Sequence, residues 1–276
     1  MDKIDLSVAI VTYKNEREIL TKAVESVLKS TGVDFRLYII DNSPSDEIRE
    51  WYKDERIDYI YNNANIGFGA AHNIIMRDSE KMGRYHLVLN PDIYFGDNVL
   101  KGLVDYMDAN PDVGNIIPKT DYPNGTRCPV CRLLPRPQDW IFRMFIPFKS
   151  WRQNITQRFL MSFCDFNQII NAPSLSGCFM FLRTSVIKEI GLFDEHIFMY
   201  GEDTDLNRRI HQKYKTLFYP KLEIVHYGAE AGHTNPRLIK IQIQSCIYYL
   251  NKWGWFFDKE RTRINNVAIE QYSVLK

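Results

Sequence analysis

Features that would assign a chain to a specialised class are missing from this sequence. Its net charge is only +1 over 276 residues, so bulk electrostatics give no reason to expect nucleic acid as a partner. No uninterrupted apolar run approaches the roughly 18 residues that indicate a membrane-spanning helix. The opening residues, MDKIDL, are partly charged and lack the apolar core of a signal peptide. We therefore expect a cytoplasmic protein.

Cysteine is also scarce, with five residues in the chain. An odd number of scattered cysteines is typical of reduced thiols rather than of a disulfide framework. Cys128 and Cys131 form a CPVC pair, but the sequence offers neither a thioredoxin-like context nor a second pair of zinc ligands. We interpret them as two incidental thiols in a loop.

The composition is that of an ordinary globular protein, with 45% hydrophobic and 25% charged residues. Over the first 117 or so residues, apolar runs alternate with segments of helical periodicity, which predicts an α/β fold with a mainly parallel sheet. The predicted strands are Ile4–Val11, Phe35–Ile40, Ile57–Tyr61, His86–Leu89 and Val113–Ile117. The first predicted helix follows Asn15 and Glu18, whose spacing resembles a capping box.

Polar residues follow several of these strands, and right-handed crossovers would bring them to one edge of the sheet. They are Thr12, Tyr13, Asp41, Asn65 and Asp92. Such a cluster predicts a nucleotide pocket. Because the first turn, VTYKNE, lacks the glycine-rich fingerprint, a dinucleotide-dependent oxidoreductase is disfavoured.

The stretch HLVLNPDIYF, residues 86–95, combines a buried strand with an abrupt polar turn. Pro91 cannot donate a hydrogen bond to a sheet, so the strand should end before it. Asp92 then lies where open α/β sheets bind ligands, and a carboxylate there could hold a divalent cation against a phosphate. A plain Asx turn at Asn90 and Asp92 is the alternative.

A second polar stretch, residues 191–210, carries Glu202, Asp203 and Asp205 at the predicted start of a helix. Acidic residues often stand there only because they interact favourably with the helix dipole. Here they follow Gly201 and an apolar wall, Phe193 to Tyr200, that would exclude water. Desolvation raises the pKa of a carboxylate and makes it a better base.

The remaining segments are less informative. Residues 119–171 are rich in proline and predict a lid or packed helices; a contact with an acceptor or a membrane, centred on Trp140 to Phe148, is the alternative. Leu217–Tyr219 and Glu223–Tyr227 are expected to be separate short strands. A helix is predicted over Arg237–Lys252, and the last residues are expected to be mobile.

Seven segments occur in a characteristic order: VAIVTYKNE, IIDNSPSD, NANIGFGAAHN, LNPD, SGCFMFLR, GLFDEHIFMYGEDTDLNRR and IVHYG. Together they resemble the family-two glycosyltransferases, most of all the bacterial rhamnosyltransferase-like branch. The resemblance runs from about Ser7 to Gly228, with a gap over the proline-rich middle.

This resemblance implies a GT-A fold, the Rossmann-like fold of nucleotide-diphospho-sugar transferases, with a C-terminal helical extension. The glycosyltransferase domain would cover residues 1–228, and the extension residues 229–276. Within the domain, residues 1–117 would bind the nucleotide sugar, and residues 118–228 would form the acceptor and catalytic half.

The resemblance also implies roles for individual residues. Those expected to bind the nucleotide sugar are Thr12, Tyr13, Asp41, Asn65, Gly67, Phe68, Asn73 and Asn90. Asp92 and His226 would hold the metal; the metal motif is usually Asp-x-Asp, and Asn90 takes its first position here, which leaves Asp92 as the charged ligand of the motif. Asp203 matches the general base, and Glu202 is the fallback.

The implied reaction is metal-dependent sugar transfer, with Mg or Mn, from a nucleotide diphosphate to a hydroxyl of a growing surface polysaccharide or lipid-linked glycan. Rhamnose from dTDP-rhamnose is the favoured donor. One carboxylate acting at the sugar implies inversion, since retention would call for a second. Another UDP- or dTDP-sugar, a catalytically silent nucleotide-sugar-binding scaffold, a homodimer and a peripheral contact with the inner membrane face all remain open.

Overall fold

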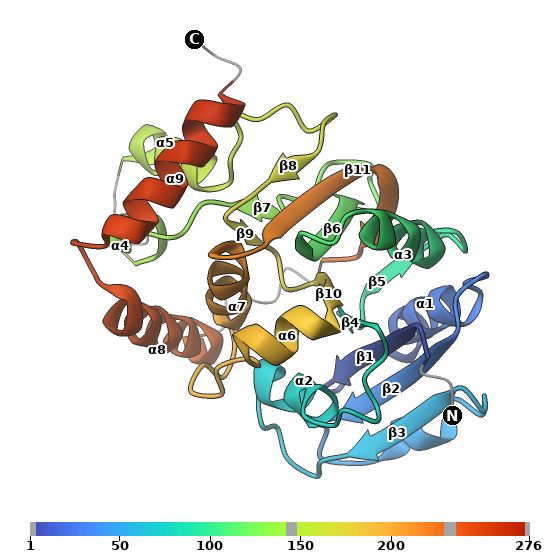
Figure 1. Ribbon diagram of the computed structural model, residues 1–276. Coiled ribbons are helices and arrows are strands. Elements are labelled where there is room, and N and C mark those ends of the chain that lie inside the picture. The colour runs from blue at the N-terminus through green and yellow to red at the C-terminus, as the bar shows by residue number, and fades with distance from the viewer. Residues whose placement is uncertain (1–3, 142–147, 229–235, 274–276) are drawn as a thin grey trace.

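A nine-stranded mixed sheet runs through the computed structural model, which describes residues 4–141, 148–228 and 236–273 (Figure 1). The strand order is β3-β2-β1-β4-β10-β6-β11-β5, and β8 pairs with β11 at the side of this path. The first four strands along the chain are β1 Leu6–Thr12, β2 Phe35–Asp41, β3 Ile57–Tyr61 and β4 Tyr85–Leu89. They are mutually parallel, as the alternating sequence pattern predicted.

Three helical segments connect these parallel strands: α1 Arg17–Leu28, the 3-10 turn η1 Glu47–Glu50 and α2 Phe68–Met76. A further helix, α3 Val99–Ala109, follows β4 later in the chain. Both faces of β1 are buried: Val8 and Ile10 join one apolar cluster, and Ala9 and Val11 join the other. A strand that is covered on both faces has a continuous apolar sequence, which explains why β1 could be predicted from the sequence.

The predicted capping box at the start of α1 is wrong. Glu16 is the N-cap residue, and its side chain accepts no capping hydrogen bond. The Asn15 side chain instead accepts a hydrogen bond from the backbone N–H of Tyr13 at 2.8 Å. Asn15 therefore shapes the loop after β1 rather than the helix start, because an Asn side chain can bond to a backbone group two residues away.

The second half of the sheet is more irregular. Its strands are β5 Ile93–Phe95, β6 Val113–Asp121, β8 Ile170–Asn171, β10 Phe179–Arg183 and β11 Lys215–His226. The two strands predicted around residues 217–227 are one long strand, with a break in register between Tyr219 and Glu223. Pro220 lies in this break; because proline lacks an N–H, it interrupts the ladder and made the sequence look like two strands.

Short elements and further helices complete the structure, and the C-terminal helices lie at the end remote from β1–β3 (Figure 1). These short elements and helices are β7 Cys131–Arg132, β9 Ser174–Leu175, α4 Pro137–Trp140, α5 Lys149–Phe159, α6 Thr184–Ile190, α7 Glu202–His211, α8 Pro236–Trp253 and α9 Lys259–Tyr272. β7 and β9 form a separate two-stranded sheet, so Cys131 lies on a strand and not in the predicted loop. The division into a domain and an extension stays a prediction.

The last residues, 274–276, lie outside the described residues, so the expectation that they are mobile stays a prediction. Helix α9 buries Ile264, Ala268 and Tyr272 against the body of the protein. The Tyr272 hydroxyl also accepts a hydrogen bond from the backbone N–H of Asn171 at 2.9 Å. Within the described ranges, no helix has the length and apolar character needed to cross a membrane.

Candidate active site

One short loop, between β9 and β10, joins the two polar stretches that the sequence singled out. The backbone N–H of Asn90 donates to the Cys178 carbonyl at 2.8 Å. The backbone N–H of the preceding residue, Gly177, donates to Asp203 Oδ2 at 2.9 Å. The turn after β4 and the start of α7, far apart in the sequence, therefore meet across two adjacent residues.

Asp203 lies at the start of α7 with hydrogen-bond donors around both of its oxygens. Oδ2 accepts from Gly177 and from Arg132 Nη1, the latter at 3.2 Å, and Oδ1 accepts from the Thr204 backbone N–H at 2.7 Å. An ionised carboxylate accepts hydrogen bonds in this way. A Cβ atom at Gly177 would lie 2.8 Å from Asp203 Cβ, so this close approach requires glycine.

Glu202, the adjacent carboxyl group, has different surroundings. Its side chain is buried, and Oε2 has no hydrogen-bond partner among the described residues. Burial, followed by the negative charge of Asp203, raises the pKa of Glu202 to about 8. The predicted acidic pair therefore has two distinct members, because Asp203 is surrounded by donors and Glu202 is desolvated.

The two predicted metal ligands lie next to one another. β5 pairs with the end of β11, which places His226 opposite Ile93 and brings its Nε2 to 3.3 Å from Asp92 Oδ1. His226 Nδ1 lies 3.7 Å from Cys128 Sγ. Burial would lower the pKa of His226, but the hydrogen bonds with Asp92 and Cys128 outweigh burial and raise it to about 9. Cys128 therefore contacts a predicted metal ligand, which the sequence interpretation did not anticipate.

This pair fits part of the donor set of a divalent metal. Magnesium sites commonly use one or two carboxylates together with phosphate oxygens and water, and imidazole is a good ligand for transition metals. A carboxylate and an imidazole that already converge could hold such an ion once a diphosphate supplied further oxygens. Over residues 4–141, 148–228 and 236–273, no group of three or more His, Cys, Asp or Glu side chains forms a complete protein site.

Asp41, the predicted base-binding carboxylate, is fully buried and bonded within the protein. Its Oδ1 accepts from Thr12 Oγ1 at 3.1 Å and from the Ser43 backbone N–H at 2.9 Å. Its Oδ2 accepts from the Tyr59 hydroxyl at 2.6 Å. The Tyr59 pKa is raised, first by burial and then by this hydrogen bond to Asp41. Asp41 therefore fixes the loop ends of β1 and β2 relative to β3.

The loop before α2 is also tied down by its own side chains. Asn65 Oδ1 accepts from the Gly67 backbone N–H at 3.1 Å, and Asn42 Nδ2 donates to the Gly67 carbonyl at 3.2 Å. Gly67 has a φ of +93°, and a Cβ there would lie 2.6 Å from the Phe198 carbonyl oxygen. Glycine is required here by both its backbone conformation and its close contact with residue 198.

Other predicted nucleotide-sugar residues lie at different depths. Asn73 is fully buried and exchanges hydrogen bonds with the backbone of Phe193, with Nδ2 donating at 2.9 Å and Oδ1 accepting at 3.1 Å. Phe68 is half-buried and makes an edge contact with Phe193. Tyr13 is 47% exposed, so its ring is accessible from solvent. Their roles in ligand binding stay predictions.

The sequence interpretation missed Arg132 as a neighbour of the site. Arg132 belongs to β7, which pairs with β9 directly before the loop of Gly177. Its two terminal nitrogens donate to Asp203 Oδ2 and to Ser176 Oγ. The CPVCR segment carried a signal for this strand in its apolar alternation, but the surrounding prolines obscured it.

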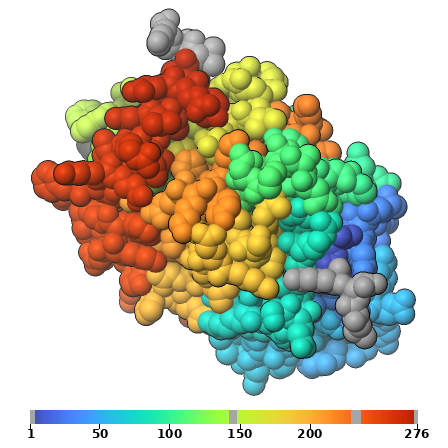
Figure 2. All heavy atoms as spheres, in the orientation of Figure 1, coloured from blue at the N-terminus to red at the C-terminus, as the bar shows by residue number. Residues whose placement is uncertain are grey.

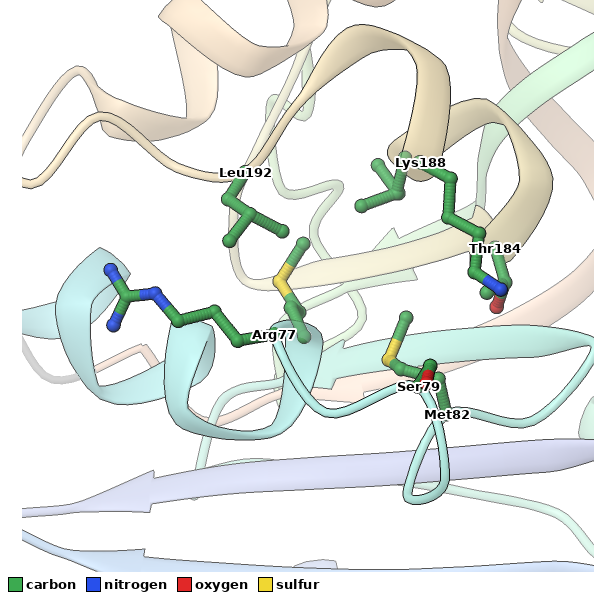
Figure 3. A pocket seen from close by; sticks show the side chains of 8 residues that line it. Arg77, Ser79, Met82, Thr184, Lys188 and Leu192 are labelled. Carbon is green, nitrogen blue, oxygen red and sulfur yellow. The ribbon is translucent and has the colours of Figure 1, made fainter.

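A cavity of about 230 Å³ lies elsewhere, between the end of α2 and α6 (Figure 3). Met82 and Leu192 contribute apolar side chains, and Arg77 and Lys188 contribute basic ones. None of the predicted site residues lines this cavity. It is separate from the candidate active site.

Comparison with known proteins gives a consistent picture. Residues 7–191 match the family model of "Glycosyl transferase family 2". The chain is 26% identical over 193 residues to the N-acetylglucosaminyl-diphospho-decaprenol L-rhamnosyltransferase of Mycobacterium tuberculosis, which covers 63% of this chain and 59% of the relative. It is 26% identical over 213 residues to the low-salt glycan biosynthesis hexosyltransferase Agl10 of Haloferax volcanii, covering 73% and 60%. The chain thus spans about three fifths of these relatives' length.

Solved structures with similar folds extend over nearly the whole chain. GalNAc-T7 with UDP, GalNAc and Mn²⁺ has a TM-score of 0.68 at 18% identity, covering 99% of this chain and 52% of that one. The mannosyltransferase PcManGT from Pyrobaculum calidifontis, in complex with GDP-Man and Mn²⁺, has a TM-score of 0.62 at 15% identity, covering 97% and 70%. These likenesses confirm the expected GT-A fold.

Proposed function

The chain belongs to glycosyl transferase family 2, and from that premise we propose that it transfers a sugar from a nucleotide diphosphate to a hydroxyl group, with inversion. The favoured donor is dTDP-rhamnose. The acceptor is a growing surface polysaccharide or lipid-linked glycan of the cell envelope, made on the cytoplasmic side. The rhamnosyltransferase name of the mycobacterial relative supports rhamnose as the transferred sugar, and the diphospho-decaprenol in that name supports a lipid-linked acceptor.

The observation that carries this proposal is the double contact of the loop between β9 and β10. Cys178 accepts from Asn90, and Gly177 donates to Asp203. A diphosphate held near Asp92 and an acceptor hydroxyl near Asp203 would therefore face each other across one fixed loop. Displacement with inversion needs a leaving group and an attacking oxygen held on opposite sides of the reacting carbon.

Asp92 and His226 would hold the metal on the leaving-group side. A divalent metal, Mg or Mn, would neutralise the charge of the departing diphosphate. The Mn²⁺ in the two solved structures named above supports this assignment. Asn90 bonds to Cys178 through its backbone, which leaves its side chain available to the nucleotide sugar.

Asp203 would take the proton of the acceptor hydroxyl. Gly177, Thr204 and Arg132 orient its carboxylate, so the base is positioned before substrate arrives. Glu202, with a pKa of about 8, holds its proton at neutral pH and is therefore better suited to donate a hydrogen bond than to accept a proton. This difference favours Asp203 over the fallback Glu202.

Calorimetry with UDP, dTDP and GDP, each with and without Mn²⁺, tests the donor side. We expect one diphosphate to bind much more tightly with the metal, and Asp92→Asn to remove most of that gain while keeping the protein folded. Equal binding with and without Mn²⁺ would mean that Asn90-Pro91-Asp92 forms only a turn and does not bind a metal. If no diphosphate binds, the donor site is wrong and the silent-scaffold alternative fails with it.

A further inference from the structure

Exposed aromatic side chains gather at the helical end of the molecule. Among the described residues, four aromatic side chains are more than half exposed: Phe148 at 67%, Trp151 at 58%, Phe256 at 64% and Phe257 at 98%. The first two lie at the start of α5, and the other two lie in the turn between α8 and α9. Figures 1 and 2 show α5 and α9 together at the end opposite β1–β3.

The turn between α8 and α9 is built to hold its two phenylalanines outward. Arg261 is only 3% exposed, and its guanidinium donates to the carbonyls of Gly254 at 3.0 Å, Trp255 at 2.8 Å and Pro135 at 3.2 Å. Asp258 accepts from the Arg261 backbone N–H and so caps α9. These bonds hold the backbone on both sides of Phe256 and Phe257, whose side chains are 64% and 98% exposed.

Basic side chains flank the same four rings. Lys259 and Arg263 lie on the first turns of α9, and Lys149 and Arg152 on the first turns of α5. None of the four makes an ion pair with any described residue. Phe256 and Phe257 line an open groove of about 680 Å³ together with Lys259 and Arg263.

The two acidic side chains between Phe257 and Arg263 bond to a buried arginine. Asp258 and Glu260 both bond to the buried guanidinium of Arg208, at 2.7 Å and 3.0 Å. Outward-facing charge around the phenylalanines is therefore positive. A surface that combines uncompensated cations with rigid exposed aromatics is complementary to a negatively charged, partly apolar partner.

We propose that this aromatic and basic end, comprising Phe148–Arg152 and Phe256–Arg263, docks onto the surface of a bilayer that contains anionic phospholipid. The rings would enter the boundary between headgroups and acyl chains, while the cations lie at the level of the phosphates. Cations near such a surface are attracted to it electrostatically, and this attraction weakens as the salt concentration increases. This inference goes beyond the proposed transfer reaction and does not depend on the donor.

The docked orientation would bring the candidate active site close to the bilayer. Trp140, in α4, packs on the ring of Tyr249 in α8, with centroids 5.1 Å apart. Its ring also reaches Gly201, where an added Cβ would lie 3.2 Å away. Gly201 directly precedes Glu202 and Asp203. Trp140 therefore contacts both the helical end, through Tyr249, and the start of α7, where the proposed base lies.

Co-sedimentation of the full chain with vesicles tests the proposal. We expect binding to vesicles of phosphatidylglycerol and phosphatidylcholine at low salt, at least tenfold weaker binding to phosphatidylcholine alone, and release by high salt. The double variant Phe256→Ser/Phe257→Ser and the double variant Lys259→Glu/Arg263→Glu should each lose at least tenfold in affinity. Lys53→Glu, an exposed charge change in the N-terminal half, should bind like the unchanged protein.

Thermal melting and diphosphate binding by calorimetry report whether the variants are folded. Failure to bind anionic vesicles at low salt would overturn the proposal, and so would equal binding of the unchanged chain and both double variants. If sedimentation shows that the unchanged protein is a dimer and Phe256→Ser/Phe257→Ser a monomer, this end is a contact between copies and the membrane assignment is wrong. Brominated lipid should quench the Trp151 and Trp255 fluorescence of the docked protein.

Discussion

The loops after β1 and β2 and the start of α7 are the two sides of the proposed site, and the carboxyl groups on the two sides have different surroundings. Asp41 is fully buried, and both its oxygens accept hydrogen bonds from Thr12, Ser43 and Tyr59. Glu202 is also buried, but its Oε2 has no partner in the described part of the chain. The polar groups of the loops after β1 and β2 bond to one another and stabilise those loops. At the start of α7, Glu202 keeps one oxygen that bonds to no described residue.

The difference reflects what each side is proposed to do. A nucleotide is the same in every reaction cycle, so a rigid loop that needs no reorganisation suits it. The proposed reaction, in contrast, moves a proton in every cycle. Glu202 is a desolvated carboxyl group beside Asp203, and its charge changes when it gains or loses a proton. Leaving a buried polar atom without a partner costs free energy, so it is expected at functional positions more than elsewhere.

The largest effect is expected from Asp203→Asn, which tests the reactive side directly. The amide keeps the shape of the carboxylate but cannot accept the acceptor's proton. We expect transfer activity to fall about 100- to 10,000-fold, the usual contribution of a general base, with diphosphate binding unchanged. Initial rates with a fixed donor and acceptor measure this loss.

Asp205→Asn is the matched control for that variant. Asp205 stands on the same helical turn, is fully buried, and pairs with Arg209 at 2.9 Å and with Lys252 at 2.8 Å. We expect this change to lower stability while leaving much of the activity at low temperature. Similar activity losses in both variants would mean that the acidic helix start has a structural role only.

Asp41→Ala is the corresponding test of the rigid side and should act on stability. Removing this carboxylate leaves the donors of Thr12, Ser43 and Tyr59 without their acceptor inside the protein. We expect the free energy of unfolding to fall by about 3 kcal/mol, measured by urea denaturation. If stability is unchanged while diphosphate binding is lost, Asp41 binds the ligand and is not primarily a structural group.

The sequence predicted the rigid side of the site better than the reactive side, for a physical reason. β1 and β4 are buried on both faces, so their apolar runs and the polar residues that follow them are visible in the sequence. Arg132 reaches Asp203 only because β7 pairs with β9, a contact between distant segments that no local pattern encodes. The contact of Cys128 with His226 was missed for the same reason.

Local patterns also failed where tertiary contacts override them. Pro220 made one strand look like two, and the polar sequence of α9 concealed a helix that packs through Ile264, Ala268 and Tyr272. The order of the seven motifs indicated the family, because this order is visible in the sequence even where strand pairings and side-chain contacts are not. It gave the position of Asp203 but not the difference between its surroundings and those of Glu202.

Glu202→Gln sharpens the comparison through pH. The folded pKa of Glu202 is about 8, above the ordinary value of 4.5, so the folded protein keeps a proton that the unfolded chain releases. The stability from this group is therefore complete below about pH 4.5 and is lost as pH rises through 8, with a slope of up to about 1.4 kcal/mol per pH unit. Glutamine cannot ionise, so the variant should lack this decline.

Urea denaturation of both proteins between pH 5 and pH 9 measures the effect. We expect the variant to approach the stability of the unchanged protein at pH 5 and to exceed it by a few kcal/mol at most above pH 8. Parallel stability curves over the whole range would show that Glu202 titrates normally. The difference between the two carboxyl groups would then be geometric and not electrostatic.

The smallest effect is expected from Thr12→Val, which removes one hydrogen bond from the rigid side without changing its shape. The Thr12 hydroxyl donates to Asp41 at 3.1 Å. Because Thr12 is fully buried, its side chain is not accessible to a nucleotide in this structure. Ser43 and Tyr59 would still donate to Asp41. We expect a loss of about 1 kcal/mol in the free energy of unfolding, typical of one hydrogen bond, and a diphosphate Kd within about twofold of the original. A clearly weaker Kd at unchanged stability would show that Thr12 contacts the nucleotide, as the family resemblance implies, and that the rigid side opens when its ligand binds.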